Sequence, residues 1–213
     1  MKQINQYFKW IPLILFLGIA VASCATKPFI NINYRLLSTS ESLEGTSVFL
    51  TFKDIRTDKT TYSDKARKEF KQFTGKFSLS LTRENEGIVD LGTFDLPGLF
   101  KEAFSKRMEN LGIKVISEQG KQVAVFEITL KSFFLDLEGG KWVTNINYEA
   151  RLIKNGKILA WQNTSGNAER AKLFGTRNAD KVLGELFTDM INEPDIVKLF
   201  QESALQQNKK RGF

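Results

Sequence analysis

Two glycine-centred turns between long strand-like segments constrain this chain most. Gly139-Gly140 separates strands predicted at 123–137 and 142–153, and Asn155-Gly156 follows the second of them. Asn-Gly favours a type I′ turn, because both central residues of that turn need positive φ. Such short connections can join only antiparallel strands. The sequence therefore predicts an antiparallel meander of three strands.

Strand register follows from the same turns. Pairing across Asn155-Gly156 predicts Leu152 opposite Leu159 and Ala150 opposite Trp161, all on the buried face.

The strand at 123–137 changes phase along its length. Its apolar residues occupy even positions at first and odd positions near the turn, from Phe133 onward. One extra residue reconciles the two halves, so the sequence predicts a β-bulge near Ser132.

Two helices are predicted from apolar stripes of helical period, at 96–111 and 178–192. Asp95 is a suitable N-cap for the first, and Gly112 suits its end. Shorter elements are predicted as strands at 29–37, 48–53, 77–81, 88–94 and 113–116, a helix within 64–73 and a turn at 196–201. The predicted fold class is α+β: a single domain with an antiparallel meander sheet and two main helices packed on one face.

The N-terminus has the pattern of a bacterial lipoprotein signal. Lys2 and Lys9 precede an apolar run of about a dozen residues, too short for the ~20 that span a bilayer as a helix. Small residues then precede Cys24, the only cysteine of the chain. We expect cleavage between Ser23 and Cys24, with lipid attached to Cys24.

Four regions follow from this pattern. Residues 1–23 are the removed signal peptide, and 24–47 are a tether that includes the first strand. Residues 48–201 form the periplasmic domain, and 202–213 are a basic, disordered tail. Ala25, rather than aspartate, favours anchoring at the periplasmic face of the outer membrane over the inner membrane.

Positive charge is concentrated in one segment and in the C-terminal tail. The 213 residues carry a net charge of +7, and the stretch 53–76 holds eight basic and four acidic residues. Four of the basic residues are predicted to form an exposed cluster: Lys65, Arg67, Lys68 and Lys71. An exported protein does not meet nucleic acid, so the candidate partners are anionic lipid or an acidic protein face. The alternative is an ordinary solvated surface.

Composition excludes catalysis that depends on histidine. The chain has no histidine and one cysteine, which removes imidazole catalysis, His-ligated metal and internal disulfides. The carboxylate pairs Asp136/Glu138 and Glu84/Glu86 show no sign of desolvation. No phosphate or dinucleotide motif is present. We expect no enzyme activity, no metal and no cofactor beyond acyl groups on Cys24.

Asp54 and Arg56 stand where a strand enters a long loop. Their spacing points both side chains the same way, so they could pair. They serve either as a polar recognition corner or as an anchor for the loop.

The chain contains 18 phenylalanines, more than is usual for this length. They indicate either a phenylalanine-rich core or an apolar groove for an acyl chain. Phe70, Phe73 and Phe77, beside lysines, are the set expected to be exposed.

The order of several short motifs resembles the YajG-type envelope lipoproteins. These are the signal, Asp54-Ile55-Arg56, a helix closing at Leu111-Gly112, the meander and a helix opened by residues 178–182. The outline is also similar to auxiliary lipoproteins of lipid-transporting ABC systems. The resemblance implies an outer-membrane-anchored periplasmic domain and an unidentified envelope protein as partner. Two functions stay open: a non-enzymatic adaptor, and a lipid or glycolipid carrier with an internal apolar cavity.

Overall fold

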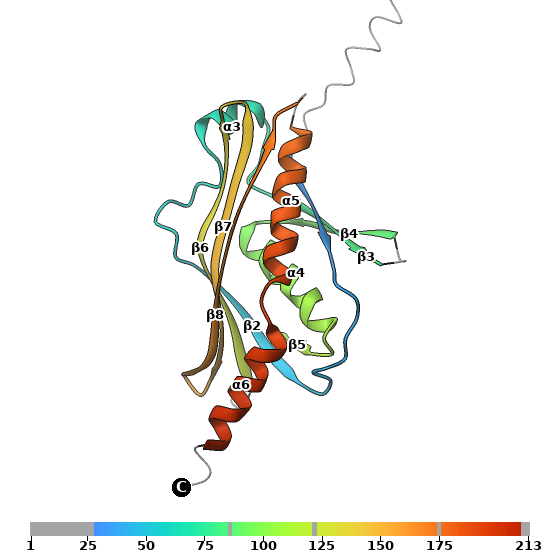
Figure 1. The fold of residues 1–213 in the computed structure, drawn as a ribbon, viewed down its shortest axis with the longest axis vertical. Helices are drawn as coiled ribbons and strands as arrows, with labels where there is room; N and C mark the ends of the chain where they lie inside the picture. Colours follow the sequence, from blue (N-terminus) through green and yellow to red (C-terminus); the bar gives the residue numbers. More distant parts are fainter. Residues whose placement is uncertain (1–27, 85–86, 121–122, 174–175, 210–213) are drawn as a thin grey trace, which may run out of the picture.

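A computed structural model describes residues 28–84, 87–120, 123–173 and 176–209 (Figure 1). They form one α+β domain with two sheets, which confirms the predicted fold class. In chain order its elements are β1 (Ile30–Arg35), β2 (Ser47–Asp54), α3 (Asp64–Glu69), β3 (Phe77–Arg83), β4 (Gly87–Phe94), α4 (Leu96–Glu109), β5 (Lys114–Ile116), β6 (Ala124–Glu138), β7 (Lys141–Lys154), β8 (Lys157–Ala171), α5 (Arg177–Asn192) and α6 (Ile196–Lys209). The signal-peptide and Cys24 predictions lie outside the described residues.

The larger sheet has five strands in the order β5-β2-β6-β7-β8. Its β6-β7-β8 part is the predicted antiparallel meander, and Asn155 and Gly156 take the positive φ values of 52° and 71° that their turn requires. However, β2 pairs in parallel with both β5 and β6, so the sheet is not wholly antiparallel. The long connections that follow β2 permit these parallel pairings.

The bulge in β6 lies where the sequence predicts it. Leu130 pairs with Tyr148 and Ser132 with Asn147, so Lys131 is left without an opposite residue. The extra residue returns Phe133 to the buried face, as expected.

The register of the second hairpin differs from the prediction. Leu152 pairs with Ala160 instead of Leu159, because Leu159 is an extra residue in β8. A shift of one residue moves every following side chain to the other face. Trp161 therefore lies opposite Arg151 and is 60% exposed, so its predicted burial is wrong.

The smaller sheet has the order β1-β3-β4, with β1 parallel to β3. Ile30, Ile32 and Tyr34 of β1 are fully or almost fully buried. The region 24–47 is therefore more than a tether, since its strand is part of the core.

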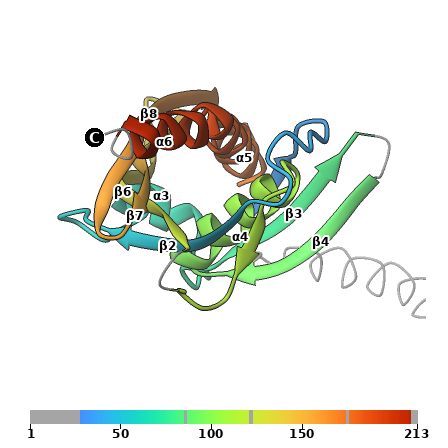
Figure 2. The ribbon, with the colours of Figure 1, turned by 90° about the horizontal axis from the view of Figure 1, so that it is seen from below.

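Helices α4 and α5 connect the two sheets. Asp95 caps α4 as predicted, accepting a hydrogen bond from the Gly98 N–H at 2.8 Å. Helix α4 contacts β2, β3, β4 and β5, while α5 contacts β1, β7 and β8 (Figure 2). Both helices thus pack on the same face of the larger sheet and hold the smaller one against it.

Helix α6 is longer than the predicted turn at 196–201. It continues to Lys209, with Ile196 and Leu199 buried against the domain. The helix therefore extends into the segment expected to be a disordered tail, and residues 210–213 lie outside the described part.

Aromatic rings fill the space between helices and sheet. Phe100 of α4 lies in the middle, with ring centroids 5.3–6.1 Å from those of four neighbours: Phe52, Phe133, Tyr148 and Phe187. The predicted exposure of Phe70 and Phe77 is wrong, because both are buried in this aromatic core and Phe73 is half-buried. Phe70 is buried because it directly follows α3 on the helix side that faces the sheet. Its ring packs on Trp142, with centroids 5.5 Å apart.

Candidate functional site

Asp54 and Arg56 form the pair that their spacing allows. The Arg56 Nε and Nη2 donate to the two carboxylate oxygens of Asp54 at 3.0 and 2.9 Å. The remaining contacts go to the carbonyl oxygens of Lys59, Thr60 and Phe133 at 3.1–3.3 Å. Because a guanidinium has five N–H donors, these five contacts use all of them. The geometry favours the loop-anchor interpretation, in which Arg56 ties the loop after β2 to β6.

The pair also changes the acidity of Asp54. Burial alone would raise the pKa of Asp54, but hydrogen bonds from Arg56 and Lys59 lower it from 3.8 to about 2.

A carboxyl with a lowered folded-state pKa stabilises the fold above its unfolded pKa. We therefore expect part of the stability to be lost as the pH falls from about 4 towards 2. Urea unfolding at a series of pH values should show a smaller acid dependence for Asp54→Asn than for the wild type. Identical acid dependence in the two proteins would contradict this.

Helix α3 presents the predicted basic cluster. The Ser63 hydroxyl accepts a hydrogen bond from the Ala66 N–H at 3.1 Å and starts the helix. Ala66 and Phe70 are buried, and they lie on one face because they are four residues apart. The other faces are turned to solvent, and all four members of the cluster are exposed: Lys65, Arg67, Lys68 and Lys71. We call these four residues the basic face.

Two neighbours position the basic face. The Arg67 guanidinium lies 5.4 Å from the ring centroid of Tyr62, within the range of a cation–π contact. The Ser63 hydroxyl donates to Asp136. Burial alone would raise the pKa of Asp136, but this bond, the Leu137 N–H and the charge of Lys65 lower it.

The basic face lies beside the start of the domain. The N–H and the hydroxyl of Thr74 both donate to the carbonyl oxygen of Pro28, at 3.1 and 3.2 Å. Thr74 comes three residues after Lys71. Sequence reasoning missed this contact, because no local pattern signals a hydrogen bond between segments 46 residues apart.

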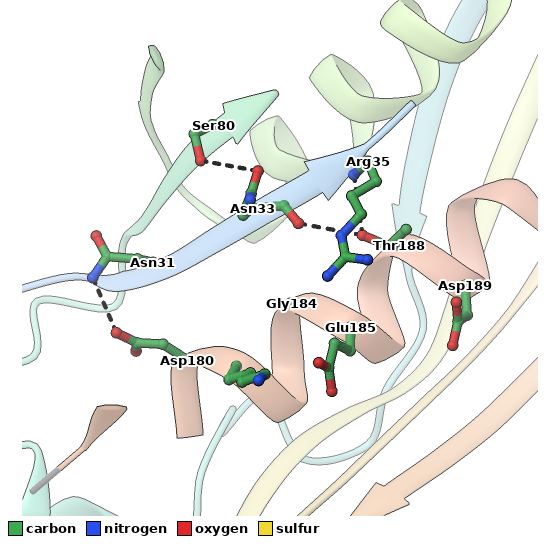
Figure 3. Close-up of a pocket in the computed structure, with 10 residues that line it drawn as sticks. Asn31, Asn33, Arg35, Ser80, Asp180, Gly184, Glu185, Thr188 and Asp189 are labelled. Atoms are coloured by element: carbon green, nitrogen blue, oxygen red, sulfur yellow. Dashed lines mark hydrogen bonds between the residues drawn. The ribbon is translucent and has the colours of Figure 1, made fainter. Parts of the chain in front are cut away.

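A polar groove of about 680 Å³ lies between β1 and α5 (Figure 3). Asn31 donates to Asp180 at 3.0 Å, and the Thr188 hydroxyl donates to the Asn33 carbonyl oxygen at 3.3 Å. These contacts hold α5 along the edge of β1. The groove was not predicted, although Asn31, Asn33 and Arg35 alternate in the sequence with apolar residues, which the structure buries.

The groove's chemistry differs from that of an acyl-chain cavity. Its lining is formed by charged, amide and hydroxyl side chains and one glycine: Asn31, Asn33, Arg35, Ser80, Asp180, Lys181, Gly184, Glu185, Thr188 and Asp189. Ligand pockets of this volume are usually lined by apolar and aromatic side chains. Its volume would suit a lipid, but its polar walls do not.

The other candidates have ordinary structural roles. Asp136 is engaged as described above, and Glu84 accepts a hydrogen bond from Ser38 at 3.1 Å. Glu86 lies outside the described residues. Within those residues, no group of three or more acidic or cysteine side chains could hold a metal ion. None of the described helices is long and apolar enough to cross a membrane.

Comparisons with known proteins identify no family. No family model matches the sequence, and no curated protein matches it. The structure is similar to a Xanthomonas campestris protein of family DUF330, with 11% identity, a TM-score of 0.49, and coverage of 84% of this chain and 99% of that one.

Two further solved structures are similar. A homologue of the neuraminyllactose-binding haemagglutinin from Helicobacter pylori has 8% identity and a TM-score of 0.39, covering 79% of this chain and 96% of that one. Rare lipoprotein B from Shewanella oneidensis has 13% identity and a TM-score of 0.34, covering 53% and 89%. At these scores the likenesses carry no argument about function.

Proposed function

We propose that this protein is a lipid-anchored, non-enzymatic envelope lipoprotein that acts as a binding or adaptor subunit. The observation that carries the proposal is the position of Cys24. It directly follows the small residues Ala22 and Ser23, after a basic start and a short apolar run. It also precedes Pro28, the first described residue, by only four positions. Acylation there would hold the whole domain at a membrane surface.

The aromatic core supports an adaptor over a lipid carrier. A carrier needs an apolar cavity of several hundred Å³. Here rings from α4, α5 and the larger sheet contact each other around Phe100, where such a cavity would lie. The described groove between β1 and α5 is polar instead.

The location within the envelope rests on the sequence. Ala25 favours sorting to the outer membrane, with the domain in the periplasm. A place beside a lipid-transport assembly follows only from the resemblance to auxiliary lipoproteins. The protein partner is expected to be an envelope protein.

Replacing Cys24 with serine tests the anchor. Cys24→Ser should abolish incorporation of radiolabelled palmitate and release the protein from the membrane fraction, because serine cannot form the thioether that carries the lipid. Mass spectrometry of the wild type should show an acylated N-terminal Cys24. A Cys24→Ser protein that still fractionates with the outer membrane at its normal mature mass would overturn the lipoprotein proposal.

A further inference from the structure

We infer that the basic face is a docking surface for anionic lipid headgroups, and that it turns the α3 end of the domain towards the membrane. The inference deepens the proposed function and uses it only to place the anchor. In Figure 1, α3 lies at one end of the longest axis and α6 at the other. Docking through α3 would therefore direct α6 and the β7–β8 turn away from the lipid.

The charges of the basic face are available to a ligand. Within the described part of the chain, Lys65, Arg67, Lys68 and Lys71 form no ion pair. Several other cations of the domain are held by carboxylates: Lys53 by Glu127, Lys131 by Glu149, Arg170 by Glu185 and Lys141 by Glu169. The basic face is thus a group of exposed cations, none of which contacts a carboxylate of the described residues at ion-pair distance.

The local balance of charge is positive. Residues 64–76 contain five basic residues and two acidic ones, Asp64 and Glu69. Glu69 is engaged by Lys172 at 2.7 Å. Asp136 offsets part of the charge of Lys65, so the strongest positive potential is expected around Arg67, Lys68 and Lys71.

The hydrogen bonds of Thr74 to Pro28 place this potential near the anchor. Pro28 lies four positions after Cys24, and four fully extended residues span at most ~14 Å. Electrostatic attraction to a charged membrane decays over a Debye length of about 8 Å at physiological salt. An anchor this close brings the basic face within reach of headgroup phosphates. An acidic protein has no such positional reason to lie there, so the geometry favours lipid.

Vesicle binding tests the inference without the anchor. The probe is the mature chain, residues 24–213, carrying Cys24→Ser, which retains every described residue. We expect it to sediment with vesicles containing phosphatidylglycerol at low salt, less at 150 mM salt, and not with pure phosphatidylcholine. Reversing the basic face with Lys65→Glu, Arg67→Glu, Lys68→Glu and Lys71→Glu should weaken binding at least tenfold.

A matched variant separates position from net charge. Lys101→Glu, Lys114→Glu, Lys157→Glu and Lys198→Glu give the same net charge at exposed sites outside α3. This variant should bind within about threefold of the unreversed chain. A basic-face variant with glutamine at the four positions should show an intermediate loss, which guards against an effect of misfolding on the glutamate variant.

Three results would overturn the inference: no binding to anionic vesicles, equal binding to neutral vesicles, or equal losses in the two charge-reversed variants. None of them bears on acylation, which palmitate labelling of Cys24 reports separately. Conversely, a protein that is never acylated could still bind the vesicles. The two proposals can therefore fail independently.

Discussion

Replacing Phe100 with alanine should lower the free energy of unfolding by about 3–5 kcal/mol, as expected for a fully buried phenylalanine. The Phe100 ring contacts residues of β2, β6, β7 and α5, so its removal opens a cavity where the helices meet the larger sheet. These neighbours belong to four different elements, which limits how far they can close the cavity. Urea unfolding of Phe100→Ala against the wild type measures the change.

Trp161→Ala provides the control for Phe100→Ala. It removes a larger ring, but one that is 60% exposed on the outer face of β8. Its effect should stay below about 1 kcal/mol. Similar losses for the two variants would mean that Phe100 does not occupy the centre of the core.

Arg56→Met should cost about 3–5 kcal/mol, although methionine fills much of the same space. The substitution leaves three loop and strand carbonyls without their Arg56 donors, and Asp54 keeps only the backbone N–H of residue 56 and the Lys59 ammonium. Removing the buried member of such an ion pair has this order of effect. The loop after β2 should also lose protection in amide hydrogen exchange.

Lys59→Met tests whether the effect belongs to Arg56 itself. Lys59 also contacts Asp54, at 3.2 Å, but its side chain is 58% exposed. Its loss should cost no more than about 1 kcal/mol. If Arg56→Met were equally mild, the pair would be a surface feature and the recognition interpretation would regain support.

Local signals in the sequence were sufficient for the meander, the two long helices and the bulge in β6. Each of these predictions depends on residues that are close in the chain. Asn155-Gly156 favours a tight turn, Asp95 caps α4, and the phase change near Ser132 requires an extra residue. Such signals act over a few residues, so they could be interpreted without knowledge of the tertiary structure.

Features that depend on distant contacts could not be predicted in the same way. The extra residue Leu159 places Gly166 against α5, and a Cβ on Gly166 would lie 2.6 Å from Met190 Cε. The position of α5 therefore selects the register. Likewise, β2 and β6 pair in parallel only because the long connection between them brings β6 back beside β2.

The features of the candidate site can also be separated into local ones, which the sequence predicted, and ones that depend on distant contacts. The exposure of the basic face and the Asp54–Arg56 pair follow from spacing within short segments. The approach of Thr74 to Pro28 and the groove between β1 and α5 do not, because each joins segments far apart in the chain.

The contacts of β1 with α5 join the two ends of the domain, so they form only when nearly all of its chain is present. Asn31 and Tyr34 find hydrogen-bond partners in Asp180 and Asn192, which follow them by 149 and 158 residues. In the export that we propose for this chain, β1 therefore emerges well before the helix that covers it. During this interval, the edge of β1 that α5 later covers has no partner. A chain shortened before residue 192 would keep part of that edge open, and open strand edges promote aggregation.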